Sequence, residues 1–106
     1  MTRATFDIHG NAFHVTIDGH AGHEDVRVCA SASMLACTLI EAMRRAEGDG
    51  YLIVFSCEAG AGDVTLQAIS TDYGCKRVQA IVDTIIAGFD ALTAEYPDNV
   101  RVEIKG

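Results

Sequence analysis

Apolar residues occupy every second position near the start of the chain. They alternate with polar residues over 4–8 and again over 13–17, on either side of the turn dipeptide Gly10-Asn11. A period of two residues is typical of a strand with one buried face. Two such segments joined by a short turn predict a β-hairpin.

The period then changes to that of a helix. Apolar residues recur three and four positions apart between about Val26 and Glu47, which predicts a first helix with one buried face. A stronger stripe of the same kind runs from Cys75 to Leu92 and predicts a second helix, which Pro97 closes.

Three further strands are predicted between and after these helices. The continuous apolar run YLIVFSC (51–57) predicts a central strand, covered on the face that carries the helices. A glycine-rich turn at 58–63 precedes VTLQAIS (64–70), which alternates, and NVRVEI (99–104) supplies the last strand.

The predicted order is therefore ββαββαβ, in one domain that covers residues 1–106. Two helices with one apolar face each favour an α+β fold, a two-layer sandwich in which both helices cover one face of a mixed sheet. The opposite face of the sheet must be solvated or meet a second subunit.

Composition narrows the class of function. Apolar residues make up 49% of the chain and charged residues 22%, as in ordinary globular proteins. No apolar run approaches the ~18 residues that span a bilayer, and the first residues do not resemble a secretion signal, so we expect a cytoplasmic protein that does not bind membranes. A net charge of −7 disfavours nucleic acid and favours a basic partner. No Cys-x-x-Cys pair occurs, and we expect neither a metal site nor a cofactor.

Candidate chemistry gathers in GHAGHEDVRVCASAS (19–33). His20 follows the second strand, and Cys29 lies at or near the first turn of the first helix, where the helix dipole favours a thiolate. A histidine at the neighbouring strand end can stabilise that thiolate and later protonate a leaving amine. Gly19 lets a substrate backbone approach closely, and N–H groups near Cys29 can polarise a scissile carbonyl. The stretch predicts an acyl-transfer site.

The other cysteines have simpler interpretations. Most cysteines of cytosolic domains are packing residues, and this alternative applies to Cys29 as well. Cys37 is expected in the core, Cys57 ends a strand expected to be buried, and Cys75 opens the second helix on its apolar stripe. Cys75 is also the main rival for reactivity, because it too lies at a helix start, but no histidine is near it in sequence.

The remaining histidines divide into two kinds. His9 and His14 fall on the polar alternation of the hairpin and are expected to be exposed. His23 lies in the loop and is an alternative base, although a loop holds geometry less well than a strand end. The acidic pair Glu24-Asp25 is interpreted as a solvated helix entry.

The motifs GHA (19–21) and VCASAS (28–33) resemble those of the ribosomal-processing cysteine protease family, often called Prp. Its members carry Gly-His-Ala after the second strand, then a loop, then a motif close to Asp-x-Val-Cys-Ala-Ala-x-Ser. The resemblance covers the whole chain, because element order and length agree as well. It implies a homodimeric cysteine endopeptidase that removes a short N-terminal extension from ribosomal protein L27. It assigns Cys29 as nucleophile and His20 as base, and it matches Gly19 and Ser33 to substrate-binding positions.

This chain departs from the family pattern at three points. The loop between histidine and cysteine is shorter, by about three residues on our reading of the motif, in a region where length changes are commonly tolerated. Val26 stands where the family has aspartate, with Asp25 one position earlier, and Ser31 replaces an alanine. A second hypothesis therefore stays open, a non-catalytic, ribosome-associated α/β binding module of the same fold in which Cys29 only packs.

Overall fold

The structure is a computed structural model that describes residues 1–19, 25–60 and 62–106. The elements of these residues are β1 (Thr2–His9), β2 (Ala12–Asp18), α1 (Val26–Gly48), β3 (Leu52–Gly60), β4 (Asp63–Ser70), α2 (Cys75–Glu95) and β5 (Val100–Lys105). This order confirms the predicted ββαββαβ arrangement. The ends of both helices lie close to those predicted, and α2 ends shortly before Pro97.

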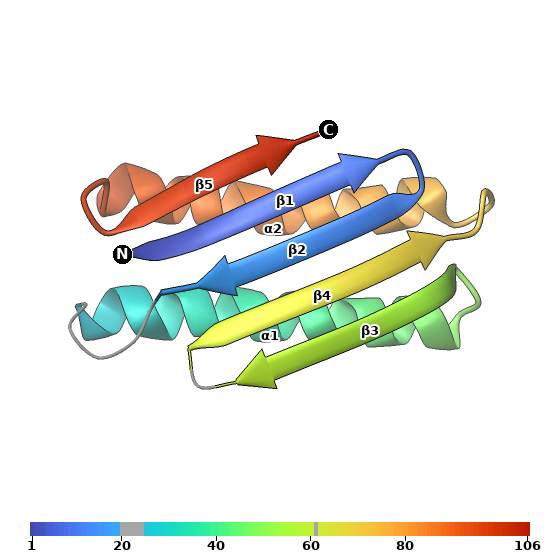
Figure 1. Ribbon diagram of the computed structural model, residues 1–106, viewed down its shortest axis with the longest axis horizontal. Coiled ribbons are helices and arrows are strands. Elements are labelled where there is room, and N and C mark those ends of the chain that lie inside the picture. The colour runs from blue at the N-terminus through green and yellow to red at the C-terminus, as the bar shows by residue number, and fades with distance from the viewer. Residues whose placement is uncertain (20–24, 61) are drawn as a thin grey trace.

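The five strands form one mixed sheet in the order β3-β4-β2-β1-β5. β1 and β5 are parallel, whereas the β1–β2, β2–β4 and β3–β4 pairs are antiparallel. Figure 1 shows both helices on the same side of the sheet, α2 behind β1 and β5 and α1 behind the β2–β4 half. The predicted two-layer α+β fold is therefore confirmed.

The core fills the space between the sheet and the helices. Alternate residues of β1 and β2 point into it, and Phe6 of β1 meets Phe89 of α2 edge-on with ring centroids 6.1 Å apart. α1 contributes Leu39 and Met43, which are fully buried. Burying an apolar side chain of this size stabilises the folded state by roughly 1.5–3 kcal/mol, so these contacts fix α1 and α2 against the sheet.

The prediction that YLIVFSC forms a central strand is wrong. β3 is an edge strand that pairs only with β4, and it runs beyond Cys57 to Gly60. A continuous apolar run is typical of a strand buried on both faces, but here a register shift between Leu52 and Val54 leaves Ile53 68% exposed. Part of this apolar run faces solvent, so its composition does not show that the strand is central.

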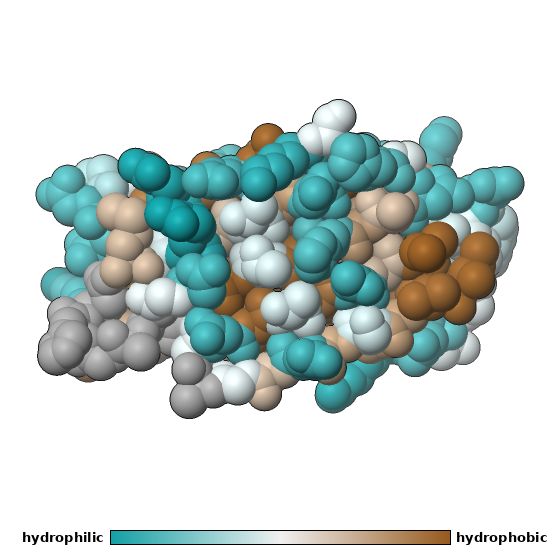
Figure 2. Space-filling view, in the orientation of Figure 1, coloured by the Kyte–Doolittle hydropathy of each residue, from teal (hydrophilic) through white to brown (hydrophobic). Residues whose placement is uncertain are grey.

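The sheet face that carries no helix is mainly polar. Thr5, Asp7 and His9 of β1 alternate with its buried residues, and β2 continues this pattern. Figure 2 views this face and shows many hydrophilic side chains, with the most prominent hydrophobic group where β3 begins and β4 ends. The pair Val54–Ile69 is exposed there. Most of the face is thus suited to contact with water.

α1 is long and apolar enough to cross a membrane when judged by length and composition alone. Its apolar face is nevertheless part of the core, where Val28, Leu39 and Met43 have no exposed surface. One face of α1 thus packs against the sheet, and 28% of its apolar 18-residue window is buried.

Candidate active site

Asp25 organises the start of the helix that carries Cys29. It is the N-cap of α1, and its side chain accepts a hydrogen bond from the Arg27 N–H at 2.8 Å. Its carbonyl oxygen accepts the N–H groups of Val28 (3.0 Å) and Cys29 (3.1 Å). Cys29 is the fourth residue of α1, which confirms its predicted place in the first turn.

The same hydrogen bonds correct one expectation. The sequence suggested that N–H groups near Cys29 are open to a substrate carbonyl, but those of Arg27, Val28 and Cys29 all donate to Asp25. An aspartate at the N-cap satisfies donors that would otherwise be left at the helix start. Asp25, four positions before Cys29, thus serves as the N-cap of α1.

Cys29 and Ser33 lie on the same flank of α1, one turn apart, as their spacing of four requires. Both side chains are half-buried. They border the buried seam of Val28, Ala32 and Ala36, which packs against the sheet. The thiol is therefore held by the core on one side and is partly accessible on the other.

Arg27 binds the Asp25 carboxylate through two of its nitrogens. Nη2 lies 2.7 Å from Asp25 Oδ2, and Nε lies 3.1 Å from Oδ1. Hydrogen bonds from the side chain and the backbone of Arg27 lower the pKa of Asp25 from 3.8 to about 2. The same contact raises the pKa of Arg27, so both groups stay charged through the neutral range.

This lowered pKa predicts a response to acid. A carboxyl group whose pKa is lower in the folded state stabilises that state fully above pH 3.8, and the stabilisation is lost as the pH falls toward about 2. We expect urea denaturation to show a larger loss of unfolding free energy over this range for the wild type than for Asp25→Asn. Asparagine caps helices but does not ionise. Since the pair is exposed, added salt should shrink the difference, and equal losses would contradict the assignment.

Gly19 follows the last residue of β2 and directly precedes the predicted base. Its φ is +79°, a left-handed conformation that favours glycine, and a Cβ atom there would overlap the backbone carbonyl oxygen of Met1. Its N–H donates to Asp63 Oδ1 at 3.4 Å. The residue that follows β2 thus contacts both the start of the chain and the start of β4.

Three residues singled out from the sequence, His20, His23 and Glu24, lie outside the described residues. The structure consequently describes Gly19, which precedes His20, and Cys29, but not the pairing of His20 with Cys29. That pairing stays a prediction.

The other three cysteines occupy different environments. Cys37 is exposed, so its predicted place in the core is wrong, because the buried seam of α1 passes through its neighbour Ala36. Cys57 and Cys75 are half-buried, and burial raises the pKa of the Cys57 thiol. Cys75 is the first residue of α2, as predicted.

Thiol reactivity tests which factor governs these cysteines. If exposure alone controls alkylation, the exposed Cys37 should react first; if the helix start and a nearby histidine favour the thiolate, Cys29 should react first. We expect limiting iodoacetamide at about pH 6.5 to label Cys29 fastest, as read by mass spectrometry of the digested protein. Faster labelling of Cys37 or Cys75 would contradict this expectation.

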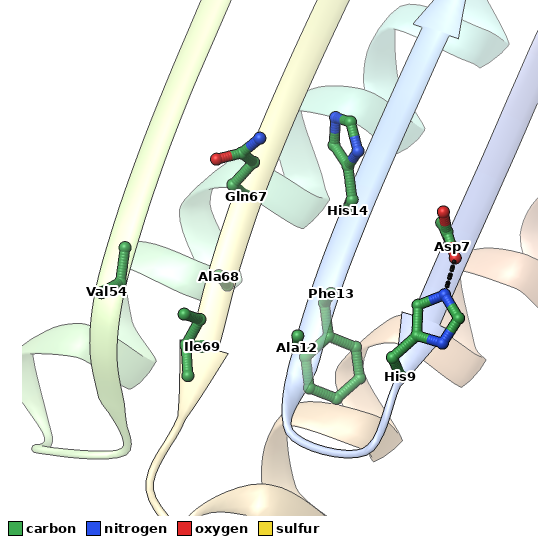
Figure 3. A pocket seen from close by; sticks show the side chains of 9 residues that line it. All are labelled: Asp7, His9, Ala12, Phe13, His14, Val54, Gln67, Ala68 and Ile69. Carbon is green, nitrogen blue, oxygen red and sulfur yellow. Dashed lines mark ion pairs between the residues drawn. The ribbon is translucent and has the colours of Figure 1, made fainter. Parts of the chain in front are cut away.

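A separate cavity of about 220 Å³ lies on the polar face of the sheet. Figure 3 shows the Asp7–His9 ion pair and His14 beside it; His9 Nε2 lies 2.7 Å from Asp7 Oδ1. The residues that line it are Asp7, His9, Ala12, Phe13, His14, Val54, Gln67, Ala68 and Ile69. His9 and His14 are exposed, as predicted. No cysteine lines this cavity, and within the described ranges no three histidine, cysteine or acidic residues are grouped to hold a metal ion.

Comparison with known proteins identifies the family and shows which solved structures share the fold. A sequence model of the family described as cysteine protease Prp matches residues 1–101. The ribosomal processing protease Prp from S. aureus, solved with a substrate peptide, superposes with a TM-score of 0.70 at 18% identity, covering 99% of this chain and 100% of that one. Its structure with a covalently linked product peptide gives 0.66 at 21% identity, over 99% and 100% of the two chains.

SMU.848 from Streptococcus mutans has a TM-score of 0.71 at 18% identity, over 99% of this chain and 94% of that one. No curated protein matches the sequence. The structural likenesses show the shared fold, and the match over residues 1–101 shows the family. The chain belongs to the cysteine protease Prp family.

Proposed function

We propose that this cysteine protease removes a short N-terminal extension from ribosomal protein L27, with Cys29 as nucleophile and His20 as base. The observation that carries the proposal is the place of Cys29, half-buried in the first turn of α1, at the far end of the segment that begins with Gly19-His20. The S. aureus relative is named as a ribosomal processing protease and was solved with a substrate peptide, which supports this substrate class.

The reaction follows the usual course for a thiol nucleophile. The Cys29 thiol gives its proton to the His20 imidazole, and the sulfur attacks the scissile carbonyl carbon. The C–N bond then breaks, the imidazolium protonates the departing amine, and the acyl group remains on sulfur as a thioester. Water, deprotonated by His20, hydrolyses the thioester and restores both groups. Since the Cys29 N–H donates to Asp25, the proposal gives that N–H no part in stabilising the oxyanion.

The charge of the chain supports the choice of substrate. The net charge of −7 complements a basic ribosomal protein, and it gives no advantage to a contact with nucleic acid. We place the reaction in the cytoplasm, where thiols stay reduced and L27 is available. Gly19 and Ser33 flank the proposed dyad in the sequence and are assigned to substrate contacts.

The proposal is tested with L27 from the same organism. If its sequence begins with a short extension ahead of the usual start, we expect the protease to release that extension from a matching peptide, as detected by mass spectrometry. A peptide with the residues around the cleavage point scrambled is the matched control. An L27 without an extension, or a matching peptide that stays intact, would contradict this substrate.

We also propose that the protein works as a homodimer with two-fold symmetry, the commonest closed arrangement. The resemblance to the family supports it, as does the exposed apolar group of Ile53, Val54 and Ile69 on the β3 side of the sheet. We expect light scattering to return about twice the chain mass of 11.3 kDa at micromolar concentrations. A mass that stays at 11.3 kDa would contradict the dimer.

A further inference from the structure

Arg27 joins the start of α1 to the end of α2. Its guanidinium carbon lies 5.6 Å from the centroid of the Tyr96 ring, while two of its nitrogens bind the Asp25 carboxylate. A guanidinium at this distance from an aromatic face is attracted to the ring electrons. Since the Arg27 side chain is 72% exposed, its position depends on these two partners more than on packing.

Tyr96 is a firm support for this contact. Its N–H donates to the Leu92 carbonyl at 2.9 Å, and its own carbonyl accepts the N–H groups of Asn99 (3.0 Å) and Val100 (3.2 Å). The side chain also packs against the core. The ring is therefore fixed at the junction of α2 and β5, and it offers a fixed surface to a long, otherwise mobile side chain.

Asp25 connects Arg27 to Cys29 through its carboxylate and its backbone carbonyl. The carboxylate that Arg27 holds also accepts the Arg27 N–H, and the carbonyl of the same residue accepts the N–H of Cys29. A continuous series of contacts thus runs from Tyr96 to Cys29. The ring contact joins Tyr96 to Arg27, the ion pair joins Arg27 to Asp25, and a backbone hydrogen bond joins Asp25 to Cys29. In the sequence, Asp25 lies between His20 and Cys29, the two residues of the proposed dyad.

We propose that Tyr96 is a positioning residue for the protease reaction: through Arg27 and Asp25 it holds the first turn of α1, and with it Cys29, in the place from which the sulfur attacks. Tyr96 need not touch substrate for this role. The inference rests on the proposed function of Cys29, and it adds a residue from the opposite end of the chain to the machinery of the site.

The experiment compares Tyr96→Leu, which removes the aromatic ring, with Tyr96→Phe, which keeps it. Backbone amide exchange of Val28 and Cys29 is followed by NMR, with Leu39 in the middle of α1 as the internal reference for global opening. We expect Tyr96→Leu to speed exchange in the first turn about two- to fivefold, the range for an exposed cation–π contact, and Tyr96→Phe to match the wild type. Leu39 should be unchanged.

Peptide cleavage is measured on the same proteins. We expect kcat to fall in Tyr96→Leu about two- to fivefold, the loss expected when an exposed cation–π contact no longer orients Cys29 in the transition state, with KM unchanged. Arg27→Lys keeps the charge but lacks the planar fork, and it should reproduce the loss even if Tyr96→Leu folds poorly. Adding Tyr96→Leu to Arg27→Lys should then lower kcat little further.

The outcomes distinguish the positioning role of Tyr96 from the proposed protease function. Faster exchange without a change in kcat, or an equal loss in Tyr96→Phe, would overturn the positioning role while leaving the protease in place. Unchanged exchange in both Tyr96→Leu and Arg27→Lys would overturn the link itself. A wild-type protein that cleaves no peptide contradicts the proposed function, and the role of Tyr96 in catalysis with it, whereas the exchange data still report on the link between the helices.

Discussion

Cys29→Ala is expected to give a folded protein that cleaves no L27 peptide. The substitution removes the attacking sulfur, and the neighbouring residues of α1 offer no thiol in its place. The side chain is half-buried and alanine is a good helix former, so the fold should persist. We expect cleavage to fall by roughly 10⁴-fold or more, as for other enzymes that lose their nucleophile.

Cys29→Ser and Cys37→Ala complete this test. Serine keeps a hydroxyl of similar size, but it is almost never ionised at neutral pH and should be nearly inactive. Cys37 lies on the exposed side of the same helix, so its removal should leave the rate unchanged. Rates come from mass spectrometry of the peptide, with circular dichroism as the check on folding. The inert Cys29→Ala protein should still bind the peptide; cleavage at the wild-type rate would contradict the assignment of Cys29 as nucleophile.

His20→Ala is expected to cost about 10²- to 10⁴-fold in kcat, the usual contribution of general acid–base catalysis. The histidine both stabilises the thiolate and protonates the leaving amine, so one substitution removes two steps. The expected loss should therefore appear in kcat more than in KM.

His23→Ala is the matched control, because His23 lies in the same loop and has the same chemistry. We expect it to cost little. Both variants are assayed with the L27 peptide at several pH values, and circular dichroism again reports the fold. If His23→Ala loses as much as His20→Ala, the base has been assigned to the wrong histidine. If neither loses activity, the dyad is wrong although Cys29 can still be the nucleophile.

Periodicity predicted most of the fold because each element buries one face. The alternation over 4–8 and 13–17 gave β1 and β2, and the stripes of α1 and α2 gave two helices that must cover the same side. Strand order was harder, because a continuous apolar run does not reveal whether its second face is covered by protein or open to water. β3 was expected at the centre of the sheet and lies at its edge.

The site was predictable only in part, for a related reason. Local motifs place Cys29 at a helix start, and the structure agrees. Cys37 was assigned to the core because cysteine is usually counted among the apolar residues of a helix. The neighbouring residue on the helix is buried instead, and Cys37 is exposed. The contact of Arg27 with Tyr96 joins distant parts of the chain. Nothing in either local sequence points to the other, so only the packed structure could show it.

The contact between Gly19 and the first residue affects how the protein should be produced for these assays. The Met1 carbonyl lies against Gly19 and leaves no space for a side chain there, so the amino end of the chain is next to the segment that leads to His20. An affinity tag fused before Met1 would begin at this place and crowd it. A tag after Gly106 would follow β5, and Figure 1 shows the C end of the chain away from the end of β2. Kinetic constants are therefore best measured on carboxy-terminally tagged or tag-free protein.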